Sequence, residues 1–415
     1  MMKMHLLRCT FGIACLFLTA CTMEQEVVID SEKKEIEFFQ TKTNVVDFFD
    51  QLIEDFETQH PDINVKQVNV PGGMEVLKTR IARGDVPDIF ITYPIEQDYM
   101  IRATRGYLLD LSEENFISEI DPTIQERYAI DGRMYGLALS QNAVGVIYNK
   151  DVFEQLQIEI PSTWDQFISV LKKLEANDLQ PLLMANKDLE RVSVFNLSLV
   201  ANTFDNHYWE AVNKNEIGLR GDQRWIEISN QMLEFLSFAQ EGSFNMEGED
   251  LNQAFMQGEG VMSVIGVWEI PNLEKINPEF DYGIFPFPAT NDPELNKVLG
   301  GVDGGFAISA DTDHPEEAKM FLEFLVEKEN AQKFSDYEGN ISTVKGVQQN
   351  NDKVHLLAEH ISQGKSVNWP NHHWVGGTAA EEDFRKISQR FFYERDIDAY
   401  LERLEIMFEM YRQHQ

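Results

Sequence analysis

The stretch Gly84-Asp-Val-Pro-Asp-Ile-Phe-Ile91 ends in three apolar residues with no polar residue between them. A short, unbroken apolar run is typical of a strand that is buried on both faces, as in a parallel sheet. Two more predicted strands precede it, Ile36-Glu-Phe-Phe-Gln40 and Ile63-Asn-Val-Lys-Gln-Val-Asn-Val70, and a helical pattern follows each of them. The order strand, helix, strand, helix, strand predicts a parallel sheet with right-handed crossovers, and therefore an α/β fold.

The ends of these predicted strands are where a binding site is expected. In open α/β sheets, ligands bind beyond the carboxyl ends of the strands. Gln40 and Lys42 stand at the end of the first strand, and Tyr93 follows the buried run. We therefore expect these three side chains to face a cleft, with Glu96 nearby.

The N-terminal segment has the pattern of an export signal that ends on a cysteine. Lys3 and Arg8 make its start positive, an uncharged stretch covers residues 9–20, and Leu18-Thr-Ala-Cys21 follows. This order is typical of a secretory signal, and the apolar part is too short to span a bilayer. Leu18-Thr-Ala-Cys21 also resembles the bacterial lipobox, whose cysteine becomes the lipidated first residue of the mature chain. The alternative is a plain signal peptide with an incidental cysteine.

We predict a signal peptide over residues 1–20 and a lipidated tether over residues 21–34. More than one acyl chain is needed for stable anchoring, and a lipidated Cys21 would carry several. The mature protein is then expected to be exported and anchored to the outer face of the bacterial cytoplasmic membrane.

Composition narrows the classes of function that the mature chain can have. Cys9 and Cys15 lie in the predicted signal, so disulfides, zinc thiolates and cysteine nucleophiles are excluded downstream of Cys21. A formal charge of −35 repels phosphate backbones, and a nucleic-acid partner is not expected. A chain of 415 residues is too long for one small core and predicts two lobes.

Four stretches, in series over essentially the whole mature chain, resemble one family. It is that of the extracellular solute-binding proteins of the maltose-binding type, the receptors of ABC sugar importers. The first is Gly84-Asp-Val-Pro-Asp-Ile-Phe90, and the third departs from the family pattern where Gly260-Val261 replaces the usual alanine. The second, third and fourth are Val144-Gly-Val-Ile-Tyr-Asn-Lys-Asp-Val-Phe153 with Ile160-Pro-Ser-Thr-Trp-Asp165, Phe255-Met-Gln-Gly-Glu-Gly-Val-Met262 with Gly266-Val-Trp268, and Gly300-Gly-Val-Asp-Gly-Gly-Phe-Ala-Ile308 with His314-Pro-Glu-Glu-Ala-Lys-Met-Phe-Leu-Glu-Phe-Leu325.

The resemblance implies a two-lobed periplasmic-binding-protein type II fold. It would have parallel-dominated sheets flanked by helices, a hinge of several chain segments, and a monomeric state. The implied crossings fall near Ser140-Gln141, near Phe285-Pro286 and over residues 337–341. The N-terminal lobe would then comprise 34–140 plus 286–338, and the C-terminal lobe 141–285 plus 339–415.

The resemblance also implies ligand contacts. A sugar offers apolar faces edged by hydroxyls, so its site needs aromatic rings, amides and carboxylates. Trp268 matches a family tryptophan that stacks on the ligand, and Asn142 matches a position that faces it; a core position is the alternative for Trp268. The other candidates are Asp303 and Gly304 in a glycine-rich turn, Asp188 and Arg191 in a segment without the family's aromatic ring, and Trp369, with Trp374 weaker, in the loop before the last helices.

A metal site and an enzyme are the remaining alternatives. His372 and His373 are adjacent, and adjacent histidines usually diverge, so we expect neither a metal nor a cofactor. A glycosidase needs a pair of carboxylates, but among 70 Asp and Glu residues any spacing occurs by chance. The sequence contains neither Gly-x-Ser-x-Gly nor His-Glu-x-x-His.

The sequence therefore favours a non-catalytic receptor. Such a lipoprotein would capture a carbohydrate, an oligosaccharide, between hinged lobes and deliver it to the permease subunits of an ABC importer. A receptor for another polar solute on the same fold and an extracellular carbohydrate-active enzyme stay open as alternatives.

Overall fold

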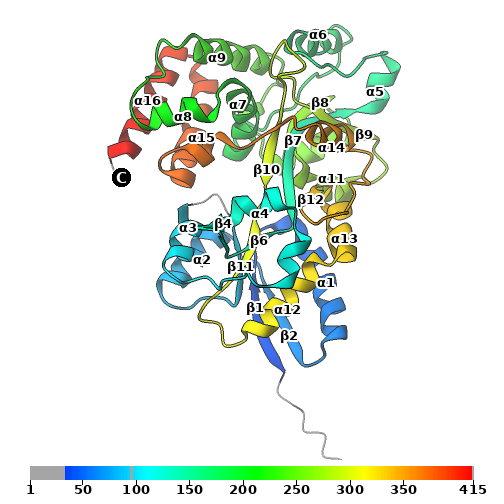
Figure 1. Cartoon of the computed structure of the whole chain (residues 1–415). Helices are drawn as coiled ribbons and strands as arrows, with labels where there is room; N and C mark the ends of the chain where they lie inside the picture. The colour runs from blue at the N-terminus through cyan, green and yellow to red at the C-terminus, as the bar shows by residue number, and fades with distance from the viewer. Residues whose placement is uncertain (1–32, 94–96, 414–415) are drawn as a thin grey trace, which may run out of the picture.

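The computed structural model describes residues 33–93 and 97–413, which form two lobes (Figure 1). One sheet has the order β2-β1-β3-β11-β6 and defines what we call the first lobe; the sheet around β7 defines the second lobe. The predicted signal peptide, Cys21 and Glu96 lie outside the described residues. Within those residues, no helix is both long and apolar enough to cross a membrane.

The first lobe contains the chain up to residue 139 and a later segment. Its elements are β1 (Lys34–Phe39), η1 (Thr43–Val45), α1 (Val46–Gln59), β2 (Ile63–Val68), α2 (Gly73–Ala82), β3 (Ile89–Thr92), α3 (Gln97–Thr104), η2 (Asn115–Glu119), α4 (Pro122–Tyr128), β4 (Ala129–Ile130), β5 (Arg133–Met134), β6 (Leu137–Ala138), β11 (Gly305–Ile308), α12 (Pro315–Val326) and α13 (Lys328–Glu338).

The predicted parallel order is confirmed at the start of the chain. β1 pairs in parallel with β2 and with β3, and the run Ile89–Ile91 is buried. β11 then adds to β3 in antiparallel register. Three rings surround Phe38 of β1, with centroids 4.8–5.3 Å away: Phe49 of α1, Phe306 of β11 and Phe321 of α12. This aromatic packing joins the later segment to the first lobe.

The second lobe contains the middle and the end of the chain. Its elements are β7 (Ser140–Asn149), α5 (Lys150–Gln155), α6 (Trp164–Glu175), α7 (Leu189–Thr203), α8 (Asn206–Asn213), α9 (Gln223–Leu236), η3 (Ser243–Asn245), α10 (Gly248–Met256), β8 (Met262–Gly266), η4 (Val267–Glu269), α11 (Ile270–Ile276), β9 (Tyr282–Pro286), β10 (Val298–Val302), β12 (Ile341–Ser342), α14 (His355–Ser362), β13 (Ser366–Val367), η5 (Pro370–His373), α15 (Gly377–Glu394) and α16 (Ile397–Gln413).

The sheet of the second lobe is mixed, and the expectation of parallel-dominated sheets is wrong for it. β7 pairs in antiparallel register with β8, β9, β10 and β12, while β10 pairs in parallel with β13. β7 is a central strand, and its neighbours in the sheet come from distant parts of the chain. The order of the predicted elements in the sequence therefore did not show whether these neighbours run parallel or antiparallel to it. In Figure 1, β7 and β10 run from the second lobe toward the first.

The chain passes between the lobes at points that differ in part from the expected ones. β7 starts at Ser140, as expected. Phe287 and Leu299, however, still pack in the core of the second lobe, and the chain enters the first sheet only after Val302. Pro286 is the last residue of β9 and pairs with Gly145, so it ends a strand of the second lobe and does not start a crossing.

The return to the second lobe also lies later than residues 337–341. Ile341 pairs with Gln141 of β7, but Val344 and Val347 still pack against the core of the first lobe. Val354 then belongs to a core cluster of the second lobe. The first lobe therefore keeps residues beyond 338, because apolar side chains of the crossing segment fill its core.

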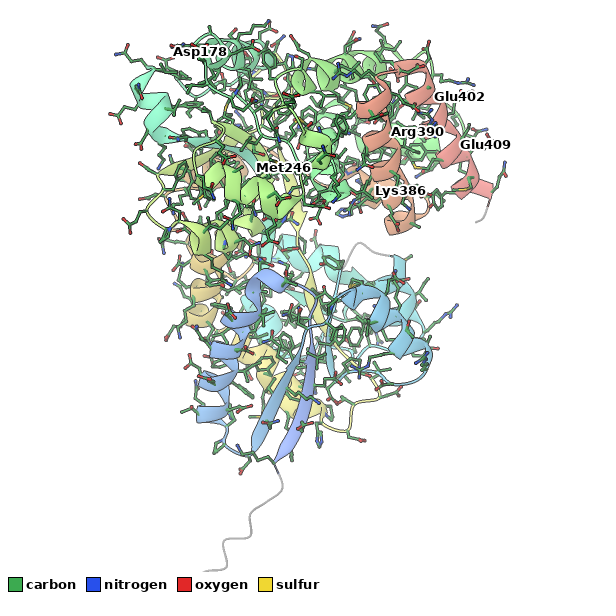
Figure 2. The ribbon with its side chains drawn as sticks, turned by 180° about the vertical axis from the view of Figure 1, so that it is seen from behind. Asp178, Met246, Lys386, Arg390, Glu402 and Glu409 are labelled. Carbon is green, nitrogen blue, oxygen red and sulfur yellow. The ribbon has the colours of Figure 1, made fainter. Side chains whose placement is uncertain are left out.

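The last two helices pack side by side on the second lobe. Figure 2 shows charged side chains on α15 and α16, among them Lys386, Arg390, Glu402 and Glu409. The opposite faces of the two helices supply the buried rings of Phe391 and Tyr400, which stack with centroids 4.2 Å apart. This packing fixes α15, whose first turns contribute to the cleft described next.

Candidate ligand-binding cleft

A cleft of about 1070 Å³ lies between the lobes. In the first lobe its wall follows β1 and β3, at the carboxyl ends of the two parallel strands. In the second lobe the wall comes from α7, η4, η5, α15 and the end of α16. The position agrees with the general rule for ligand sites in α/β sheets.

Lys42 stands between two carboxylates in the first-lobe wall. Its ammonium contacts Asp303 and lies 2.9 Å from Oε1 of Glu338. The three side chains are 17 %, 8 % and 1 % exposed, respectively. Burial alone would lower the pKa of Lys42, but the two carboxylates raise it above its usual value. The ammonium therefore stays charged and holds the loop after β1.

Glu338 is placed by the end of a helix. It is the last residue of α13, and Gly339 follows with a φ of 69°, a conformation that glycine adopts without steric cost. Oε1 of Glu338 also accepts a hydrogen bond from Nδ2 of Asn44 at 3.3 Å. The same Nδ2 donates to the backbone carbonyl of Trp268 in the second lobe at 3.1 Å. Asn44 therefore connects the buried ion cluster to the other lobe.

Two indole rings lie next to each other in the second lobe. The centroids of Trp268 and Trp369 are 6.2 Å apart, and the ring planes meet at 45°. Nε1 of Trp369 donates to Oδ1 of Asn142 at 3.2 Å. The ring of Trp268 packs over Gly266, where an added Cβ would come within 2.1 Å of the indole. The glycine in Gly266-Val-Trp268 is thus needed for the position of this ring.

Two pairs of a guanidinium and a carboxylate lie in the second-lobe wall or directly behind it. Arg191 lies 2.7 Å from Oε2 of Glu269, which also accepts from Asn252 at 2.8 Å. On α15, Glu381 accepts from Arg385 at 2.6 Å, and its other oxygen accepts from Asn371 at 2.7 Å. Carboxylates and amides held in this way can bind hydroxyl groups.

Glu190 lies in the first turn of α7 and lines the cleft. Its backbone N–H donates to the N-cap residue Asp188 at 2.9 Å, which fixes the start of the helix. The enclosing walls raise the pKa of Glu190 by removing water, although Arg385 and Arg191 lower it.

Residues 42–332 match the family described as bacterial extracellular solute-binding protein, which is most of the chain. This protein belongs to that family. The multiple sugar-binding protein of Streptococcus mutans is 27% identical over 382 residues, 90% of this chain and 89% of that protein. The melibiose/raffinose/stachyose-binding protein MelE of Bacillus subtilis is 23% identical over 338 residues, 78% of each chain.

Solved structures share the fold of this solute-binding protein. The solute-binding protein RafE in complex with raffinose has a TM-score of 0.83 and is 27% identical, covering 91% of this chain and 99% of that one. Its apo form, from Streptococcus pneumoniae, has a TM-score of 0.78 at 26% identity, with 92% and 99% covered. The two-lobed fold expected from the resemblance is therefore confirmed. The family is extracellular, so the protein is exported.

Six of the residues expected to bind the solute line this one cleft, as the structure places them. They come from both lobes: Lys42, Tyr93, Asn142, Trp268, Asp303 and Trp369. Their segments are far apart in the sequence, so the fold brings them together. Their role as ligand contacts stays a prediction.

The other expected residues lie behind the walls of the cleft. Gln40 is fully buried and donates to Gln67 of β2 at 2.8 Å, and Gly304 lies under the ring of Tyr93. Asp188 caps α7, and Arg191 faces Glu269. Trp374 reaches the cleft but is only 5% exposed, packed among core rings.

The sequence did not single out four charged groups in the cleft. Glu190 and Glu269 are neighbours of expected residues, so a wider window around Arg191 and Trp268 would have included them. Glu381 and Arg385 lie on α15, far from the other cleft residues in the sequence. The many charged residues of this helix are typical of a solvent-exposed face, so its sequence did not indicate that it reaches the cleft.

The two adjacent histidines lie in η5 and line the cleft. Burial lowers the pKa of His373, so its ring is neutral at pH 7. The backbone carbonyl of His373 accepts from Nδ2 of Asn213 at 2.6 Å, which holds the loop in place. Among the residues that the structure describes, no group of three or more His, Cys, Asp or Glu side chains is placed to hold a metal ion.

Proposed function

We propose that this protein is a non-catalytic receptor that binds an oligosaccharide between its lobes and delivers it to the permease subunits of an ABC importer. The observation that carries the proposal is the composition of the cleft, where Trp268 and Trp369 lie with Asn142 and Asp303 between two lobes. Indole rings cover the apolar faces of a sugar, while amides and carboxylates bind its hydroxyls. The names of the relatives that span most of the chain support a sugar.

Binding requires no covalent chemistry in this proposal. A ligand that contacts both walls favours the closed arrangement of the lobes by its differential affinity for the two states. The segments that pass between the lobes around Ser140, around Val302 and over residues 341–354 would act as the hinge. The permease then distinguishes the loaded receptor by its closed shape.

We further propose that Cys21 carries the lipid anchor and that the mature protein works as a monomer on the outer face of the cytoplasmic membrane. The sequence around Leu18-Thr-Ala-Cys21 supports the anchor. Mass spectrometry of the membrane fraction tests it: an acylated N-terminal peptide starting at Cys21 is expected. A soluble protein with an unmodified cysteine would contradict it.

Isothermal titration calorimetry of the mature domain with a saccharide panel tests the binding function. We expect one site per molecule and recovery of the saccharide unchanged by chromatography after long incubation. Cleavage products would support a carbohydrate-active enzyme instead. Binding of a different polar solute, with every saccharide silent, would retain the receptor but change its ligand class.

A further inference from the structure

The charges that line the cleft are unequal in number. In the first-lobe wall, one ammonium, that of Lys42, faces the two carboxylates of Asp303 and Glu338. In the second-lobe wall and directly behind it, where Arg191 lies, two guanidinium groups accompany three carboxylates. These groups are Arg191, Arg385, Glu190, Glu269 and Glu381. Each wall therefore has one negative charge in excess when all of these groups are ionised.

The positive groups of the cleft are already occupied. Lys42 and Arg191 are held by carboxylates at 2.9 and 2.7 Å, and Arg385 is held by Glu381 at 2.6 Å. Nε of Arg385 has no hydrogen-bond partner, but it is enclosed by protein atoms and does not offer a donor to the cleft. His373 adds no charge because burial lowers its pKa. The lysine and arginine side chains of the described cleft lining, Lys42 and Arg385, therefore already have carboxylate partners, which a ligand anion would have to share or displace.

Glu190 differs from the other carboxylates. Asp303, Glu269 and Glu381 each contact a basic side chain. The side chain of Glu190 is exposed to the cleft, and its carboxylate makes no hydrogen bond or ion pair within the described part of the chain. It is therefore an acceptor that a ligand hydroxyl can satisfy, while a ligand carboxylate or phosphate would face it as a like charge.

We infer that the cleft selects uncharged saccharides over carboxylated or phosphorylated ones, and that Glu190 is the specificity-determining residue of this selection. The inference rests on the proposed carbohydrate function and adds the charge class of the ligand. Like charges placed together in a desolvated site are unfavourable enough to exclude a wrong partner. A ligand carboxylate near Glu190 is therefore expected to weaken binding at least about tenfold.

The test compares matched saccharide pairs by calorimetry at pH 8, where the carboxylates of the ligands are ionised and histidine is neutral. The probes are raffinose and maltotriose, each with its counterpart in which a terminal C6 hydroxymethyl is oxidised to a carboxylate. For wild-type protein, the uncharged member is expected to bind at least about tenfold more tightly than its acid. An acid that binds as tightly as its uncharged partner would overturn the inference and leave the carbohydrate function standing.

Two variants assign the effect to one residue. Glu190→Gln keeps the shape of the side chain and removes its charge, so the preference for the uncharged member should shrink several-fold. Glu175→Gln makes the same change in charge on an exposed part of α6, outside the cleft, and should leave the ratio unchanged. Equal ratios in the two variants would overturn the role of Glu190. If neither these probes nor any other saccharide of the panel bound, the proposed carbohydrate function would fail, and this inference with it.

Discussion

The two walls of the cleft are built in different ways. The first-lobe wall is a compact ion cluster, in which Lys42 is enclosed by Asp303 and Glu338. The second-lobe wall presents the indoles of Trp268 and Trp369. The charged groups of the first wall thus pair with one another and hold the hinge segments together. The second wall leaves its indole rings available to a ligand. The difference predicts that mutations in the first wall change stability and that mutations in the second change affinity.

The largest effect is expected for Lys42→Ala. This change leaves the buried carboxylates of Glu338 and Asp303 without their cation, and removing one partner of a buried pair costs about 3–5 kcal/mol. Because Lys42 keeps 17% exposure, a loss near the lower value is expected in the free energy of unfolding. Chemical denaturation followed by tryptophan fluorescence measures it. A loss below about 1 kcal/mol would show that the cluster is not a structural centre.

A second substitution separates charge from packing. In the double variant Lys42→Ala with Glu338→Gln, one of the uncompensated carboxylates is gone, so part of the lost stability should return. If the losses in the free energy of unfolding of the two single variants simply added in the double variant, the ion cluster would not act as a unit.

The next effect is expected in binding. Trp268→Ala removes an aromatic face of the second wall and should weaken the affinity for the saccharide by about 1–3 kcal/mol. Tyr393→Ala is the matched control, because this ring is 76% exposed and lies outside the cleft. Calorimetry on both variants tests the difference, and an unchanged affinity for Trp268→Ala would remove this residue from the ligand site.

A smaller effect is expected at the contact between the walls. Asn44→Ala removes the hydrogen bonds to Glu338 and to the carbonyl of Trp268, so a loss of about 1 kcal/mol in the free energy of unfolding is expected. Asn64→Ala breaks only an exposed hydrogen bond to Glu35 and serves as the control. Equal losses in the two variants would contradict a special role for Asn44 between the lobes.

The smallest effect is expected for an exposed ion pair between the lobes. Lys275 of α11 lies 2.8 Å from Asp47 of α1, with the two side chains 53% and 67% exposed. Exposed pairs contribute about 0–1 kcal/mol, so Lys275→Ala should change stability by less than 1 kcal/mol, and less still at high salt. A loss comparable to that of Lys42→Ala would show that buried and exposed ion pairs of this protein do not differ in their contribution to stability.

The same comparison shows how far the sequence could predict the site. The first three strands were predicted from local apolar patterns, and their ends located Lys42 and Tyr93 in the cleft. Gln40 was misplaced, because it lies buried beside β2, where Gln67 accepts its hydrogen bond. Position at a strand end alone did not decide which side chains turn toward the cleft.

The second wall depended on pairings that local patterns do not encode. Trp268, Asn142 and Trp369 could be named only through the resemblance to a family, since their contact joins three distant segments. Glu381 and Arg385 were missed because the packing of α15 against α7 and α16 decides which face of the helix reaches the cleft. The crossing expected near Pro286 falls after Val302 for a similar reason. The pairing of β10 with β7 keeps the chain in the second lobe up to that point.

If one saccharide contacts both walls of the cleft, its binding should bring the two lobes closer together. Small-angle X-ray scattering of the mature domain, with and without a saccharide at a concentration that calorimetry shows to be saturating, tests it most directly. We expect a smaller radius of gyration in the saturated sample, and no such decrease for Trp268→Ala at a concentration that leaves this variant mostly unliganded. Identical profiles for free and saturated wild-type protein would contradict closure of the lobes around the ligand.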